Sequence, residues 1–281
     1  MRRAAAFALP ALLLAGCAAA SQAPAQTDAL TIENRYPLEY AKQFTVDVCA
    51  GGYDLITIDG SRYLVVPEGA AAPADLDADI TVLQQPIQNI YLVSSSAMDP
   101  IISIGGLGAV ALSGTQAENW YLDAARTAME QGEIAYAGKY SAPDYETILS
   151  ADCGLAIENT MIYHTPEVKE QLEKFGIPVL VERSSYESDP LARMEWVKLY
   201  GILFDKEAEA ETFFNEQVQR IRPLLGQDTT GKTAAFFSVT SNNLVTVRKS
   251  NDYVAKMIGM AGGEYVFSNL SDNGNNLATI N

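Results

Sequence analysis

The residue types that could do chemistry in this chain favour binding over turnover. The 281 residues include one histidine, His164, and no G-x-S-x-G, P-loop or H-E-x-x-H motif. A single histidine severely limits acid–base and metal chemistry. His164 lies at a helix entry, which is typical of a solvated residue, with axial haem ligation as the alternative. We therefore expect no catalytic residue, no cofactor of the protein itself and no resident metal.

Polar and aromatic side chains instead follow the ends of apolar, strand-like runs. Ser94 to Ser96 and Glu158 end two such runs, and Arg183 and Tyr186 follow a third. Loops at carboxyl strand ends carry the ligand contacts of α/β folds. Tyr140 is a further aromatic candidate on a loop. Structural roles remain open for each: helix capping for Glu158, packing on a helix for Tyr186, and a plain surface position for Tyr140.

The amino terminus has the pattern of a processing signal. Arg2 and Arg3 precede an apolar run, residues 4–14, that is too short to span a bilayer. Residues 14–17, LAGC, resemble the lipobox of bacterial lipoproteins, in which the cysteine thiol carries a diacylglycerol. We expect Cys17 to be lipidated and to anchor the chain at the extracytoplasmic face of the cell membrane. The alternative is an ordinary secretory signal.

Composition excludes one class of partner and permits a large core. The formal net charge is −16, so binding to nucleic acid, whose phosphates need basic neutralisation, is disfavoured. Hydrophobic residues make up 48%, enough for one large or two modest domains. Cys49 and Cys153 allow a disulfide in an exported protein, but two buried thiols are the commoner situation.

The elements that must position these residues alternate along the chain. Residues 43–66 contain three apolar runs separated by Gly51-Gly52 and Asp59-Gly60, which predicts a small antiparallel sheet. Between residues 90 and 182, strand-like runs alternate with helical patterns, which predicts a parallel sheet with helices on its faces. Helices are predicted over 98–110, 118–129, 143–149, 165–175, 191–204, 205–225 and 250–260, with Trp120 and Trp196 in the core. Strands over 231–239 and 244–247 begin a second α/β unit.

Five segments share their order and spacing with a known family. They are residues 140–149, 166–179, 189–196, 248–253 and 260–267. Together they resemble the iron-complex and cobalamin substrate-binding proteins of ABC importers, over roughly residues 40–281. The resemblance implies an α/β fold of two lobes joined by a long helix, with the ligand in the cleft between the lobes.

The resemblance also divides the chain. The expected parts are a lipoprotein signal at 1–17, a tether at 18–39, an N-terminal lobe at 40–204, a linker helix at 205–225 and a partial C-terminal lobe at 226–281. Members of that family run further, so the second lobe is expected to be truncated.

Ligands of the family are iron-siderophores, haem or cobalamin, held by aromatic side chains and a few polar groups. The resemblance therefore implies ligand contacts from Tyr140, Glu158, Arg183, Tyr186 and Arg248. Arg248 begins the second lobe and would meet an anionic ligand, with a plain surface charge as the alternative.

Family members also carry an acidic residue on each lobe that docks onto basic residues of the permease. Glu146 matches the first of these acids. The second position falls near Gly259, which has no carboxylate, and Glu264 is the nearest acid.

The predicted function is thus capture of a metal-chelate or tetrapyrrole ligand outside the cell and its delivery to an ABC permease. Two alternatives stay open: an exported α/β hydrolase-like enzyme, and an interaction lipoprotein that binds no ligand. Turnover of siderophore esters would favour the first, and no binding of any ferric siderophore, haem or cobalamin would favour the second.

Overall fold

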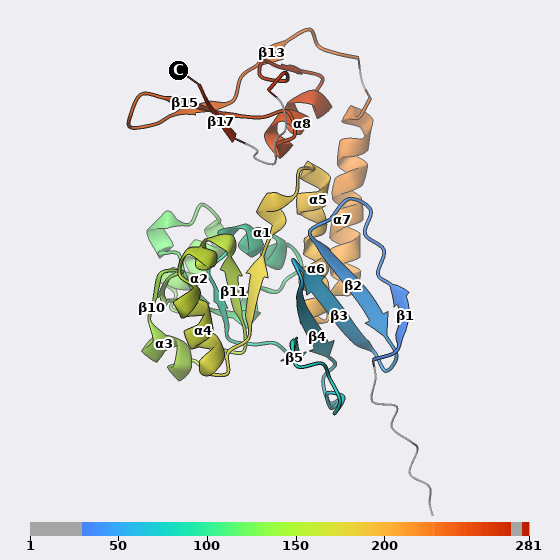
Figure 1. The fold of residues 1–281 in the computed structure, drawn as a ribbon, viewed down its shortest axis with the longest axis vertical. Coiled ribbons are helices and arrows are strands. Elements are labelled where there is room, and N and C mark those ends of the chain that lie inside the picture. Colours follow the sequence, from blue (N-terminus) through green and yellow to red (C-terminus); the bar gives the residue numbers. More distant parts are fainter. Residues whose placement is uncertain (1–29, 227, 271–276, 281) are drawn as a thin grey trace, which may run out of the picture.

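The computed structural model describes residues 30–226, 228–270 and 277–280. Cys17 and residues 18–29 of the expected tether lie outside the described residues. Two five-stranded sheets form the main body, and a long helix leads from it to a smaller C-terminal part (Figure 1). The mixed α/β class is as predicted.

The first sheet, called the hairpin sheet, has the order β1-β2-β3-β4-β5. Its strands are β1 (Ile32–Arg35), β2 (Phe44–Cys49), β3 (Tyr53–Ile58), β4 (Ser61–Val66) and β5 (Ile80–Gln84). The pairs are antiparallel except for β4 with β5, which is parallel. Asp59 and Gly60 have φ angles of 49° and 84°, the left-handed conformation that a type I′ hairpin requires of both turn residues. The predicted hairpin is confirmed.

The boundary of the tether was predicted wrongly. Asn34 in β1 pairs with Val48 in β2, so residues 32–35 belong to the folded body rather than to a flexible linker. The prediction failed because β1 forms by pairing with β2, and the mostly polar residues of β1 give no local signal of a strand.

The second sheet, called the parallel sheet, has the order β12-β11-β6-β7-β8 and only parallel pairs, as predicted. Its strands are β6 (Ile90–Leu92), β7 (Val110–Ser113), β8 (Ala135–Tyr136), β11 (Ala156–Asn159) and β12 (Val179–Glu182). In Figure 1 the yellow arrow of β12, which carries no label, points toward α5 (Pro190–Glu195) and the C-terminal part, so the carboxyl ends of these strands face that way.

The helices of the main body are α1 (Ser95–Ser103), α2 (Asp123–Glu130), α3 (Tyr145–Ser150), α4 (Pro166–Lys174), α5 (Pro190–Glu195) and α6 (Val197–Phe204). The helix predicted over 98–110 is wrong beyond Ser103, because Gly105 adopts a φ of 70° and β7 begins at Val110. The helix predicted over 191–204 is two helices that meet at Trp196, and Asp205 ends α6 with a φ of 55°.

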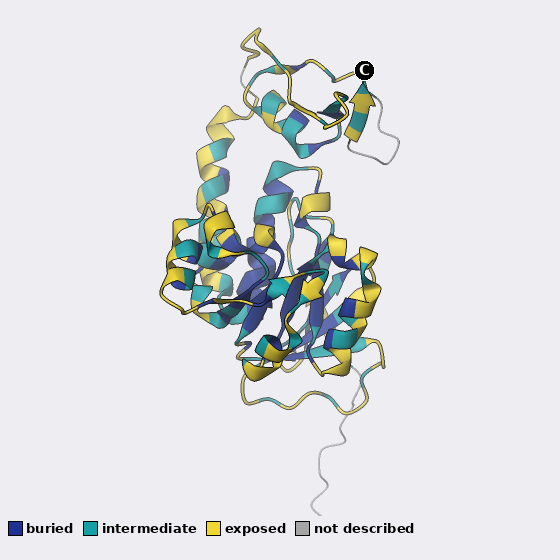
Figure 2. Ribbon diagram, turned by 90° about the vertical axis from the view of Figure 1, so that its left-hand side faces the viewer, coloured by how far each residue is buried: buried dark blue, intermediate teal, exposed yellow. Residues whose placement is uncertain are grey.

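Alternation along the parallel sheet separates two hydrophobic clusters. On one face, Leu92, Ile157 and Leu180 pack with α1, α2, α5, α6, α7 (Glu207–Ile221) and the hairpin sheet. On the other face, Ala156 and Val181 pack with α3 and α4. We call these the α6 face and the α4 face. Figure 2 shows the buried strands between exposed outer helix surfaces. Trp120 and Trp196 are both buried in the cluster on the α6 face, as predicted.

The long helix is α7 (Glu207–Ile221), which Figure 1 shows rising beside the main body toward the C-terminal part. The C-terminal part contains β13 (Thr233–Ala234), β14 (Phe237–Val239), β15 (Val245–Arg248), α8 (Tyr253–Met260), β16 (Glu264–Tyr265) and β17 (Leu277–Ile280). β13 pairs with β16, and β14-β15-β17 form an antiparallel sheet. α8 contacts α5, which joins this part to the main body.

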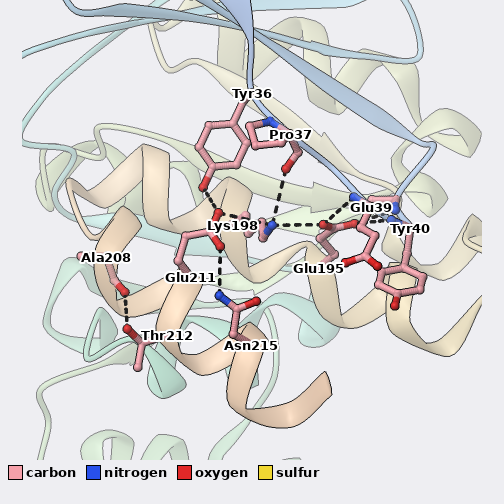
Figure 3. Close-up of polar contacts among 11 residues, drawn as sticks. Tyr36, Pro37, Glu39, Tyr40, Glu195, Lys198, Ala208, Glu211, Thr212 and Asn215 are labelled. Atoms are coloured by element: carbon pink, nitrogen blue, oxygen red, sulfur yellow. Dashed lines mark hydrogen bonds and ion pairs between the residues drawn. The ribbon is translucent and has the colours of Figure 1, made fainter. Parts of the chain in front are cut away.

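A buried polar network fixes residues 36–43 against α5, α6 and α7 (Figure 3). The Glu195 carboxylate accepts hydrogen bonds from the backbone N–H groups of Glu39, Tyr40 and Ala41, at 2.7–2.8 Å. Lys198 lies 3.2 Å from Glu195 and 3.3 Å from Glu211. Because these groups satisfy one another, the segment that enters the fold is held rigidly beside the long helix.

Candidate functional site

The carboxyl edge of the parallel sheet, meaning the loops that follow β6, β7, β8, β11 and β12, gathers exposed tyrosines. One tyrosine lies on each of four loops or strand ends, and each is between 42% and 98% exposed: Tyr121 after β7, Tyr136 ending β8, Tyr163 after β11 and Tyr186 after β12. A large aromatic side chain usually buries much of its surface. Four exposed rings along one edge therefore form a surface suited to stacking against a flat ligand.

Beneath this edge, a buried carboxylate ties two of the loops together. Glu182, at the end of β12, accepts hydrogen bonds from the hydroxyls of Ser94 and Ser96 at 3.0 and 2.9 Å and from the backbone N–H of Ser184 at 2.8 Å. The side chain of Glu182 is buried. Ser94 and Ser96 therefore hold the loop after β6 against the end of β12, and Glu182 already accepts a hydrogen bond from each of their hydroxyls.

Arg183 and Tyr186, both predicted as ligand contacts, lie together. The Arg183 guanidinium lies 4.4 Å from the centroid of the Tyr186 ring, and its Nη1 donates to Asp59 of the β3–β4 hairpin at 2.6 Å. The ion pair joins the hairpin sheet to the carboxyl edge. Tyr186 is half exposed, and the Arg183 guanidinium lies over its ring.

Tyr140 and Glu146 lie near one another in the chain but in different settings. Tyr140 occupies the turn between β9 (Gly138–Lys139) and β10 (Ala142–Pro143), where it is partly buried against the cluster on the α4 face. Glu146 is exposed in the first turn of α3, a helix capped by Asp144, which accepts from the Thr147 N–H. Glu146 is thus accessible to another protein.

Glu158 is placed differently from the expectation. Its side chain has no exposed surface, and neither carboxylate oxygen has a hydrogen-bond partner among the residues that the structure describes. Burial raises the pKa of Glu158 to about 8, so the carboxyl is mostly protonated at neutral pH. Glu158 has the same parity in β11 as Ala156 and so points to the α4 face rather than to the open edge. A ligand at the edge would not contact it in this arrangement.

Arg248 lies on the C-terminal part, at the end of β15. Its Nη1 is 3.4 Å from Asp252, and its backbone carbonyl accepts from the Tyr265 hydroxyl at 2.7 Å. Two contacts cross the junction between the main body and the C-terminal part: the Arg193 guanidinium lies 3.5 Å from the Tyr253 ring centroid, and the Lys256 Nζ lies 3.9 Å from the Asp189 carboxylate.

The described residues contain no group of His, Cys, Asp and Glu arranged to hold a metal ion. Cys49 and Cys153 are both buried and free, which agrees with the reading as two thiols rather than a disulfide. Burial raises the pKa of both thiols, so they are poor nucleophiles. Among the helices that the structure describes, none combines the length and the apolar character needed to cross a membrane.

Comparison with solved structures assigns the fold. A periplasmic binding protein of Veillonella parvula superimposes with a TM-score of 0.57 at 14% identity, over 80% of this chain and 70% of that one. A periplasmic haem-binding protein of Vibrio cholerae superimposes with a TM-score of 0.55 at 16% identity, over 69% and 70%. The chain has the fold of these periplasmic binding proteins. At such identities the likeness extends to the fold alone.

Comparison of sequences adds one curated relative. It is an uncharacterized lipoprotein of Methanocaldococcus jannaschii, 24% identical over 242 residues, or 80% of this chain. The chain spans 56% of that protein's length. No family model matches the chain.

Three of the four edge tyrosines, Tyr121, Tyr136 and Tyr163, were not among the predicted site residues. No strand was predicted before Tyr136, and Tyr121 lay inside the helix predicted over 118–129, so only Tyr163, after the run that ends at Glu158, had a signal. It was missed because single tyrosines on loops are individually unremarkable in a sequence, and only the parallel order of the strands brings them to one edge.

Proposed function

We propose that the protein is the extracytoplasmic solute-binding component of an ABC importer and that it captures an iron-siderophore, haem or cobalamin-type ligand. The observation that carries the proposal is the row of exposed tyrosines along the carboxyl edge of the parallel sheet. The periplasmic-binding-protein fold supports it, because ligands of open α/β sheets bind outside the carboxyl ends of the strands.

The chemistry of the edge fits a bulky, partly aromatic ligand. Tyrosine rings give large, rigid contact areas, and their hydroxyls hydrogen-bond or coordinate at the rim. In this proposal Tyr186 stacks on the ligand with Arg183 fixed behind it, Tyr140 borders the same edge, and Arg248 approaches from the C-terminal part to meet an anionic group.

The location and the partners follow from the same proposal. A diacylglycerol on Cys17 would hold the protein at the extracytoplasmic face of the membrane, and the lipoprotein name of the relative supports such an anchor. Glu146, exposed at the start of α3, would dock onto basic residues of the permease.

A titration panel tests the proposal. The protein is titrated with a ferric catecholate, a ferric hydroxamate, haem and cobalamin, and quenching of tyrosine and tryptophan fluorescence is followed. At least one compound is expected to bind at a single site. Replacing Tyr163 and Tyr186 together with alanine should weaken that binding about tenfold, since each stacking contact contributes about 0.5–1.5 kcal/mol.

The matched control is Leu149→Ala, which removes an exposed apolar side chain from α3, outside the carboxyl-edge loops. It should leave the affinity unchanged. Absence of binding to all four compounds, or an equal loss in the control, would contradict the proposal and favour an interaction lipoprotein.

A further inference from the structure

A carboxylate from the hairpin sheet reaches the carboxyl edge of the parallel sheet. Asp59 lies in the turn between β3 and β4, and its Oδ2 accepts a hydrogen bond from the Arg183 Nη1 at 2.6 Å. Arg183 directly follows β12, and its guanidinium lies 4.4 Å from the centroid of the Tyr186 ring. Tyr186 is one of the four exposed edge tyrosines. The hairpin sheet therefore contributes a negative charge to the surface that is proposed to bind the ligand.

Arg183 needs an anion and is only partly satisfied by Asp59. The side chain of Arg183 is 15% exposed, so most of it is withdrawn from water, where a cation without a counter-ion is unfavourable. Among the residues that the structure describes, Asp59 is its one carboxylate partner, and the buried Nε of Arg183 has no acceptor. A carboxylate that meets a guanidinium with both oxygens makes two hydrogen bonds, whereas Asp59 makes one. A bidentate anion would compensate Arg183 more completely.

Asp59 is placed so that another anion can replace it. Its side chain is 52% exposed, and within the described part of the chain its carboxylate accepts from Arg183 only. A methyl group added to Gly60 would meet no atom within 4 Å, so the space beside the turn is open. An ion pair with an exposed partner contributes free energy equivalent to at most about a fivefold change in an equilibrium constant. Replacing Asp59 on Arg183 therefore costs little.

Arg248, the other arginine that is proposed to meet the ligand, has a partner of a different kind. The Asp252 side chain, 3.4 Å from Arg248, is 1% exposed. Asp252 also caps α8 by accepting from the Val254 N–H at 2.9 Å. Displacing it would leave a helix end uncapped and a buried carboxylate without its cation. Asp252 therefore stays in place, whereas Asp59 can exchange.

We infer that Asp59 is an exchangeable counter-ion at the carboxyl edge, and that a carboxylate of an aromatic ligand takes its place on Arg183. Arg183 is then paired with an anion both in the empty protein and in the complex. The ring of the ligand contacts Tyr186, which is 50% exposed beside the guanidinium. A neutral ligand leaves the pair of Asp59 and Arg183 intact. Asp59 thus lowers the affinity for anionic ligands alone and determines how strongly binding depends on the charge of the ligand.

The inference rests on the proposed function for its natural ligand, but two small probes test it without that ligand. The full chain with Cys17→Ser, which carries no acyl group at residue 17, is titrated with naphthoate and with naphthylmethanol. The two probes share a ring system and differ in charge. Naphthoate is expected to bind severalfold more tightly and to shift the amide resonances of Gly60 and Tyr186 in nuclear magnetic resonance spectra.

The decisive variant is Asp59→Asn. It keeps the turn, because Asn-Gly is a favoured pair in type I′ hairpins. Removing the competing carboxylate should raise the affinity for naphthoate about three- to fivefold and leave that for naphthylmethanol unchanged. Arg183→Gln should abolish the preference for naphthoate. If Arg183→Gln has a lowered thermal midpoint, the comparison of the two probes on the wild type and on Asp59→Asn stays decisive.

The matched control is Asp47→Asn, which makes the same change in net charge. It breaks the ion pair of Asp47 with Arg35, 2.9 Å apart on β2 and β1 of the same sheet, and should change neither affinity. Equal affinities of the two probes, weaker or unchanged naphthoate binding in Asp59→Asn, or an equal gain in Asp47→Asn would each overturn the inference.

Failure of the inference and failure of the proposed function give different results. Binding of one of the four panel compounds, combined with any of the contrary naphthoate results, would leave the proposed function standing without the exchange. The expected naphthoate results, combined with no binding of any panel compound, would leave the exchange standing and contradict the proposed function.

Discussion

Buried glutamates on the two faces of the parallel sheet differ in whether their carboxylates have hydrogen-bond partners. On the α6 face, Glu182 accepts three hydrogen bonds, and in α5 Glu195 accepts three more and pairs with Lys198. On the α4 face, Glu158 has no partner for either oxygen. Glu158 and Glu182 are in adjacent parallel strands, one residue out of register. Both side chains are buried, so Glu158 and Glu182 differ in their hydrogen-bond partners and not in their burial.

The difference shows what each buried acid does. Glu195 organises the backbone of residues 39–41, which would otherwise have unpaired N–H groups next to the long helix. Glu182 holds the loops after β6 and β12 at the carboxyl edge. Glu158 organises no other group, and its burial raises its pKa to about 8. The hydrogen bonds of Glu195 and Glu182 therefore stabilise the fold, whereas the burial of Glu158 stabilises nothing else in it.

The largest expected effect is from Glu195→Ala. The substitution leaves Lys198 with Glu211 as its remaining partner and the N–H groups of residues 39–41 without their acceptor, so the free energy of unfolding should fall by about 3–5 kcal/mol. Urea denaturation measures the loss, and amide exchange should speed up in residues 39–41. The matched control is Glu216→Ala, which removes an exposed partner of Arg220 and should cost about 0.5 kcal/mol or less. Similar losses in Glu195→Ala and Glu216→Ala would show that the buried contacts of Glu195 stabilise the fold no more than an exposed ion pair does.

Much of the fold was predictable because its signals are local. Asp59-Gly60 between two apolar runs specifies a hairpin, and Pro166 begins α4 as predicted. Helices around Trp196 were harder to separate, since a buried helix pair is apolar on most sides and shows no break in its period.

The site was less predictable than the fold because it depends on pairings across the chain. The acceptors for residues 39–41 lie more than 150 residues away in Glu195, and no sequence pattern links them. The position of Glu158 did have a signal: two residues after Ala156 in a strand, it must share the buried face of Ala156. Weighing that alternation above the strand-end rule would have removed Glu158 from the ligand contacts.

A smaller effect is expected from Glu182→Gln. The amide keeps one acceptor oxygen but replaces the other with an NH₂ group, so the hydroxyls of Ser94 and Ser96 lose their charged acceptor. The expected loss in unfolding free energy is about 1–3 kcal/mol. Ser96→Ala removes one donor only and should cost less. If Glu182→Gln is neutral, the charge on this face has no structural role and the two faces differ less than the contacts indicate.

An effect of opposite sign is expected from Glu158→Gln at neutral pH. The pKa of Glu158 is raised from 4.5 to about 8, so between these pH values the folded protein binds more protons than the unfolded chain. Stability should therefore fall as pH rises through this window, by at most about 1.4 kcal/mol per pH unit from this group. Glutamine stays neutral and removes that contribution.

Urea denaturation of the wild type and Glu158→Gln from pH 4 to pH 9 measures the difference. The variant should gain stability relative to the wild type progressively above pH 4.5, and the gap should level off above about pH 8. A pH-independent difference for Glu158→Gln would mean that water or a cation reaches the α4 face and compensates the carboxylate, which would make the two faces alike.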